Sequence, residues 1–90
     1  MPQNDRESIL EECKRALDLA LVEKTRAEAE YAEAHDAYDR ADKLDRQGKH
    51  YALTVGVIQA PMYANRRLKR AERIHAAALA RYQKAVEPLR

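Results

Sequence analysis

Apolar side chains recur every seven residues through the first half of the chain. Larger side chains stand at one position of this repeat, and small ones stand three residues later. The larger set is Leu10, Leu17, Lys24, Tyr31, Tyr38 and Asp45, and the small set is Cys13, Ala20, Ala27, Ala34 and Ala41. Because positions i, i+3 and i+7 share one face of an α-helix, the pattern predicts a long helix with a seam that packs against another helix. The small residues allow the partner backbone to come close.

The first helix is predicted over about residues 5–47, a range that contains neither Pro nor Gly. Asn4 is suited to cap its N-terminus, and Glu7 stands three residues later, as in a capping box. Gly48 is suited to the left-handed conformation that ends many helices.

Residues 51–64 carry no charged side chain, although 36% of the chain is charged. Three conformations compete for this segment. It could begin a second helix kinked at Pro61, form a short helix before a new one that starts at Pro61, or form a short extended segment. We favour a helical path that breaks or bends near Pro61, because a lone strand would have no partner in the chain. The turn and the charge-free residues after it are therefore placed at about 48–60.

The heptad returns in a second predicted helix over about residues 61–87, which Pro88 ends. Its members are Leu68, Ala71, His75, Ala78, Tyr82 and Ala85. A fold at Gln47–Gly48 pairs residues whose numbers add up to about 95, so that most layers join a large side chain to a small one. The sequence predicts one all-α domain over residues 1–90: a long antiparallel helical hairpin, coiled-coil-like with an Ala-rich seam, with or without a short third helix.

A single hairpin of this composition would have a thin core. Leu, Ile and Val supply 16 of the 90 residues, and the chain has neither Trp nor Phe. Several large apolar residues fall outside the seam, and we expect them to mediate self-association: Leu19, Leu21, Val22, Ile74, Leu79 and Val86. A homodimer or higher oligomer would complete the core as a four-helix arrangement. A charged residue at Leu21 or Leu79 is expected to dissociate it.

Charge divides the chain into two unlike halves. Residues 1–46 hold 13 acidic and 8 basic side chains, whereas residues 47–90 hold 2 acidic and 9 basic ones, which gives the total of +2. Five of the basic residues form a run: Arg66, Arg67, Lys69, Arg70 and Arg73. Such a run can contact nucleic-acid phosphates. The hairpin register, however, places it opposite Glu23, Glu28, Glu30 and Glu33, with Glu30 beside Arg67. We favour this pairing of an acidic helix with a basic one as the reason for the asymmetry.

Catalytic and ligand-binding signals are weak. Glu72 and His75 have the Glu-x-x-His spacing of metal-binding bundles, but four-residue matches arise often in a charged helix. No nucleophile, base or phosphate-binding loop is recognisable. We therefore expect no enzyme activity, no metal and no cofactor.

The location and role follow from these observations. A single cysteine, Cys13, the absence of an apolar stretch of about 18 residues and the polar N-terminus favour a cytoplasmic protein that does not enter membranes. Tyrosines beside apolar residues are common at interfaces, so we expect a protein partner to bind Tyr51, Leu53, Val57, Ile58, Met62 and Tyr63. The favoured function is a self-associating interaction module of the adaptor or inhibitor type. The alternative is a nucleic-acid-binding hairpin dimer that uses the basic run, and a metal-binding bundle comes third.

Overall fold

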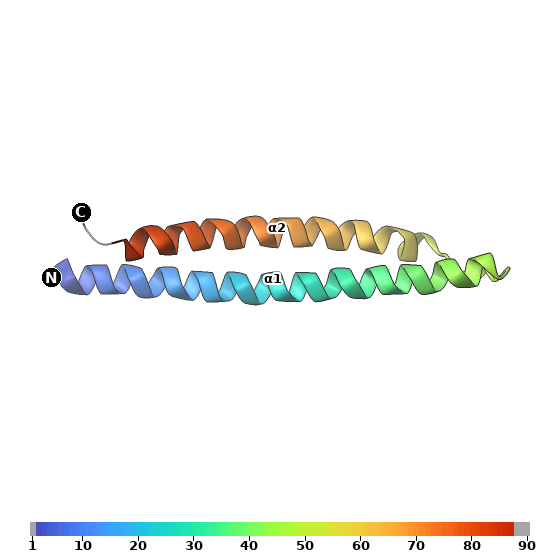
Figure 1. Ribbon diagram of the computed structural model, residues 1–90, viewed down its shortest axis with the longest axis horizontal. Helices are drawn as coiled ribbons and strands as arrows, with labels where there is room; N and C mark the ends of the chain where they lie inside the picture. The colour runs from blue at the N-terminus through green and yellow to red at the C-terminus, as the bar shows by residue number, and fades with distance from the viewer. Residues whose placement is uncertain (1, 88–90) are drawn as a thin grey trace.

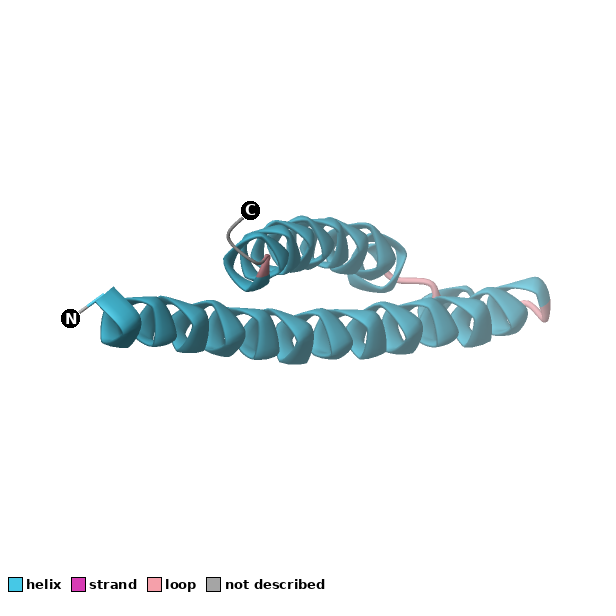
Figure 2. Ribbon diagram, turned by 60° about the vertical axis from the view of Figure 1, so that its left-hand side comes forward, coloured by secondary structure: helices cyan, strands magenta, loops and turns pink. Residues whose placement is uncertain are grey.

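The protein is a helical hairpin about four times as long as it is wide. The computed structural model describes the backbone of residues 2–87 and the side chains of residues 5–87. Helix α1 (Pro2–Arg46) leads through the 3₁₀ helix η1 (His50–Ala52) to helix α2 (Val55–Val86). The two long helices lie side by side and antiparallel (Figures 1 and 2), within extents of 70 × 19 × 14 Å. The predicted all-α hairpin is confirmed. The short third helix that the sequence allowed before Pro61 does not form, because residues 55–60 belong to α2 and η1 is a single 3₁₀ turn.

Helix α1 begins earlier than predicted. Its first residue is Pro2, so Asn4 lies inside the helix, and the prediction that Asn4 caps it is wrong. Proline suits the first turn of a helix, because its fixed φ is helical and the amide hydrogen that it lacks would have no partner there.

Gly48 follows the end of α1 and has the left-handed conformation that the sequence predicted. Its φ is +91°, a conformation that glycine adopts without steric cost. The Lys49 amide donates to the Leu44 carbonyl at 2.9 Å, and the Gly48 amide donates to the Asp45 carbonyl at 2.9 Å. This pair of bonds is the Schellman motif, which satisfies carbonyls that the helix end leaves free.

Helix α2 begins at Val55, six residues before the predicted start at Pro61. The Oγ1 atom of Thr54 accepts a hydrogen bond from the Val57 amide at 3.2 Å, which caps the helix. Pro61 lies inside α2, which is bent rather than broken (Figure 1). A proline there cannot donate the usual hydrogen bond to the Val57 carbonyl. The prediction that a new helix starts at Pro61 is wrong, and residues 2–87 contain no strand.

The seam between the helices consists of the small residues of the heptad. The buried side chains among residues 5–87 are Cys13, Ala20, Ala27, Ala41, Ala64 and Ala71. The larger residues of the repeat, from Leu10 to Asp45, are half-buried beside them. The predicted seam is therefore confirmed. No large side chain in the described part of the chain is fully buried, so the core of the hairpin consists mainly of small side chains.

A pair of glycines tests the backbone argument. We expect Gly48→Ala to lower the free energy of unfolding by about 1 kcal/mol, because an L residue is strained at positive φ. Gly56→Ala should have the opposite sign, a gain of about 0.5–1 kcal/mol, because Gly56 lies within α2 and a Cβ there meets only Thr54 Oγ1 at 3.9 Å. Urea unfolding followed by far-UV circular dichroism at one protein concentration measures both. Equal effects of the same sign would contradict the assigned cap.

A pair of alanines tests the seam. Ala64 is 1% exposed, so we expect Ala64→Leu to force the helices apart and to cost about 1–3 kcal/mol of unfolding free energy. Ala76 is exposed on the same helix, and Ala76→Leu should change stability by about 0.5 kcal/mol or less. The same urea titration serves for both variants. A tolerated leucine at position 64 would show that the helices are not in close contact there.

Candidate interaction surfaces

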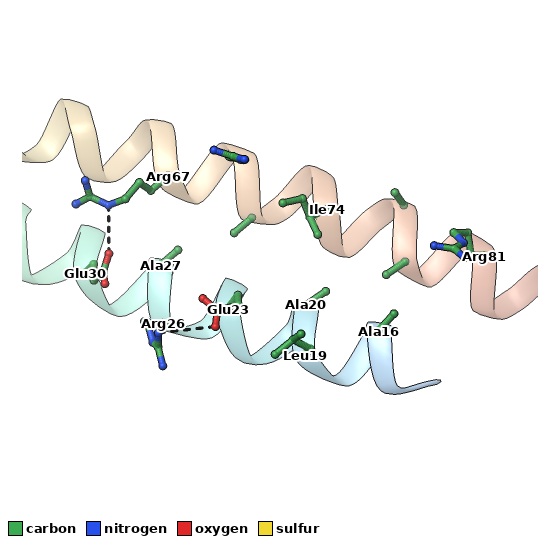
Figure 3. Close-up of a pocket in the computed structure, with 14 residues that line it drawn as sticks. Ala16, Leu19, Ala20, Glu23, Arg26, Ala27, Glu30, Arg67, Ile74 and Arg81 are labelled. Atoms are coloured by element: carbon green, nitrogen blue, oxygen red, sulfur yellow. Dashed lines mark hydrogen bonds and ion pairs between the residues drawn. The ribbon is translucent and has the colours of Figure 1, made fainter. Parts of the chain in front are cut away.

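A groove of about 790 Å³ runs along one side of the hairpin between α1 and α2 (Figure 3). Its floor is formed by alanines from both helices: Ala16, Ala20, Ala27, Ala71, Ala77 and Ala78. Figure 3 shows Ala16, Ala20 and Ala27 pointing towards α2. Two large apolar side chains border this floor, Leu19 with 63% and Ile74 with 52% of their surface exposed. The groove is thus apolar at its base and open to solvent.

The two walls of the groove carry opposite charge. Helix α1 contributes Glu23 and Glu30, whereas α2 contributes Arg67, Arg70 and Arg81. Arg26 also belongs to the α1 wall, but it points away from α2 (Figure 3), with 3.7 Å between its Nη1 atom and Glu23 Oε1. One wall is therefore acidic and the other basic.

One contact joins the two walls. The Nε atom of Arg67 donates a hydrogen bond to Glu30 Oε2 at 3.3 Å, which confirms the predicted neighbours and the register of the hairpin. Both side chains remain largely exposed, so this ion pair contributes about 0–1 kcal/mol and chiefly selects the alignment of the helices.

Two of the residues predicted to mediate self-association border the groove. All six, from Leu19 to Val86, are exposed, but only Leu19 and Ile74 line the groove. Leu21 follows Leu19 by two residues, which turns it about 200° around the helix axis. Leu79 is likewise absent from the groove lining. The sequence identified the exposed residues. Helical periodicity distributes them around each helix, and the packing of the seam decides that Leu19 and Ile74 border the groove.

The predicted partner-contact residues lie at the turn end of the hairpin. Tyr51 is 78% exposed, and Ile58, Met62 and Tyr63 are also exposed, whereas Leu53 and Val57 are half-buried. A second, more open cavity of about 430 Å³ includes Ile58 and Met62 and is completed by Tyr31, His35, Tyr38, Pro61 and Asn65. Val55 is exposed too and was missed, because its place in the first turn of α2 was not recognised. Contact of this surface with a protein stays a prediction.

The members of the basic run have different surroundings. All five of its side chains are exposed, and Arg67 is the member that pairs with α1 in the described part of the chain. Glu23, one of the predicted partners of the run, instead pairs with Arg26 on its own helix. The guanidinium carbon of Arg66 lies 5.7 Å from the centroid of the Tyr63 ring, a cation–π contact. The i, i+3 spacing of Tyr63 and Arg66 was a signal for this contact that sequence reasoning passed over.

The remaining candidates form no chemical site. Glu72 and His75 are half-buried, and residues 5–87 contain no group of three or more His, Cys, Asp or Glu side chains that could hold a metal. Cys13 is a buried free thiol on the seam. No helix in the described range is long and apolar enough to cross a bilayer.

Comparisons of the chain with protein-family models, with curated proteins and with solved structures found no match.

A double-mutant cycle tests the interhelical ion pair. We expect Glu30→Gln and Arg67→Gln to show a coupling free energy of about 0.2–1 kcal/mol at low salt, because both side chains are largely exposed. The coupling should fall towards zero near 1 M salt, where screening is strong. Urea unfolding of the four proteins gives the value. A coupling above about 2 kcal/mol would mean that the pair is buried in solution.

Proposed function

We propose that the protein is a non-enzymatic interaction module that assembles by self-association, in which two hairpins pack groove to groove to form a four-helix bundle. The observation that carries this proposal is the groove itself, with its alanine floor, its exposed Leu19 and Ile74 and its oppositely charged walls. Small floor residues let a second pair of helices approach closely, and Leu19 and Ile74 would be covered by them.

The exposed area of the hairpin supports a need for a partner. Its accessible surface is 7266 Å² for a mass of 10.3 kDa. A compact folded monomer of this mass exposes about 5,400 Å². The excess, about 1,900 Å² for one chain, exceeds the surface that each partner buries in a standard protein–protein interface, about 800 Å². A second copy covering the groove would remove part of this excess from water.

The charges of the walls favour a second copy as the occupant and select its orientation. A twofold axis parallel to the length of the hairpin places α1 of each copy over α2 of the other. Rotation about this axis causes no shift along it, so the level of Glu30 in one copy meets the level of Arg67 in the other. An axis across the length would instead stack the acidic α1 on the partner's α1. Charge complementarity favours the first arrangement.

This arrangement leaves the turn end accessible. Tyr51 and Met62 are not part of the groove lining and lie away from the groove face of α2, so pairing through the groove does not cover them. Two such ends would lie at the same end of the bundle, because the twofold axis runs along it. The module would thereby present its predicted partner-contact residues twice.

Two leucines on one helix provide the test. We expect the purified chain to have twice the mass of 10.3 kDa by size-exclusion chromatography with light scattering at micromolar concentration. Leu19→Glu should raise the dissociation constant at least about 100-fold, because it buries a carboxylate in an apolar interface twice per dimer. Leu21→Glu is the matched control. The sequence alone predicts that a charge at Leu21 dissociates the dimer, but Leu21 is absent from the groove lining, so in the proposed arrangement this variant should leave the dimer intact.

The outcomes separate the possible surfaces. A monomeric wild-type chain would overturn the proposal. A dimer that dissociates with Leu21→Glu but survives Leu19→Glu would move the interface to the other flank of the hairpin. Far-UV circular dichroism of both variants confirms that a change in mass does not come from a loss of helix.

A further inference from the structure

We infer that the outer surface of α2 binds double-stranded DNA through a basic ridge formed by Arg66, Lys69, Arg70 and Arg73. This activity goes beyond self-association and does not rest on it. The ridge lies on the side of α2 that faces away from α1, because residues 64, 68 and 71 of the same helix form the seam. All four side chains are exposed.

The positions of the four cations form an ordered array. Arg66 and Arg73 are seven residues apart, so they lie nearly on one line along the helix, opposite the seam. Lys69 and Arg70 lie between them, and steps of 100° per residue place one on each side of that line. The array therefore has a crest and two charged flanks within about two helical turns.

The hairpin does not neutralise this charge. In the described part of the chain, the one ion pair from the basic run to α1 is that of Arg67 with Glu30. Helix α2 contains a single acidic residue, Glu72, which is half-buried. The pairing of an acidic helix with a basic helix thus accounts for one of the five cations, and the other four face solvent. Pairing between the helices therefore does not account for most of the positive charge in residues 47–90.

The shape of the ridge selects the class of polyanion. An α-helix with side chains is about 10–12 Å across, and the major groove of B-form DNA is about 12 Å wide. Lys69 and Arg70, on opposite flanks, would each face one of the two phosphate backbones that border the groove. Arg66 and Arg73 would extend the contact by a turn in each direction. The major groove of an RNA duplex is too narrow for this entry.

Other polyanions fit less well. A helix that lies on an anionic membrane buries a stripe of large apolar residues along its length, whereas this ridge has the exposed Val55, Ile58 and Met62 only before it and continues into alanines at 76, 77 and 80. Single-stranded nucleic acid is bound by several stacked aromatic rings in a groove. The ridge is convex and has one aromatic neighbour, Tyr63, whose ring already lies beside the Arg66 guanidinium.

The experiment measures fluorescence anisotropy of a labelled DNA duplex about two helical turns long. We expect a dissociation constant of about 1–100 μM near 50 mM NaCl, with a slope of log K against log salt of about −3.6 for four phosphate contacts. The variant Arg66→Gln/Arg73→Gln should weaken binding at least about tenfold and reduce the slope by about 2. Arg70 is left unchanged because it also borders the groove.

A matched variant controls for net charge. Arg15→Gln/Arg40→Gln removes two exposed cations from α1, far from the ridge, and should change the affinity less than threefold. Absence of binding up to about 100 μM at low salt, or equal losses in the two double variants, would overturn the inference. Equal or tighter binding of an RNA duplex would also overturn it. So would tighter binding to vesicles of phosphatidylcholine and phosphatidylserine.

The inference and the proposed dimer can fail separately. Leu19→Glu acts in the groove and leaves Arg66, Lys69 and Arg73 unchanged, so this variant should still bind the duplex. Arg70 borders the groove and is uncovered when the dimer dissociates, so the salt slope per chain should be equal to or steeper than that of the wild type. A monomeric chain that binds DNA would overturn only the proposed dimer. A dimer that does not bind DNA would overturn only the inference about the ridge.

Discussion

Close approach of two helix backbones along a line of small side chains is the interaction on which this structure depends. Cys13 and the alanines that follow it at seven-residue intervals allow this approach, and Ala64 and Ala71 do the same from α2. Close packing recovers dispersion energy along the contact, but alanine buries little apolar area. The hairpin consequently gains a well-defined register and little core. Because the seam has room only for small side chains, several leucines and isoleucines remain exposed, and the chain has a large surface for its mass.

Charge adds alignment to this weak core. The seam alone would tolerate a shift by one heptad, because each repeat resembles the next. The contact of Arg67 with Glu30 and the Schellman turn at Gly48 both favour one alignment. Neither is strong by itself, and the ion pair is exposed. The ion pair, the Schellman turn and the short connection through η1 together favour the antiparallel hairpin in this register.

The sequence predicted the seam well and the helix ends less well, for identifiable reasons. Heptad spacing depends only on which side chains share a face, so Leu10 to Ala41 and Leu68 to Ala85 were placed correctly. Helix ends depend on competing local signals. Asn4 was taken as a cap although Pro2 can occupy a first turn, and Pro61 was given more weight than the Thr54 cap. Ala64, three residues after Pro61, is buried in the seam, and α2 is continuous despite the missing hydrogen bond at Pro61.

The amino-acid sequence by itself determined the two helices, the faces that meet and the opposite charge of the two halves, because periodicity and composition are properties of the chain. Only the tertiary structure decided which exposed residues share a surface and which cations are neutralised. Leu19 and Leu21 are two residues apart and lie on nearly opposite sides of α1. Arg66 and Arg67 are adjacent, yet one lies beside a tyrosine ring and the other on a glutamate of α1. Helical periodicity separates the two members of each pair, and the packing of the seam decides which of them is turned towards the groove or towards α1.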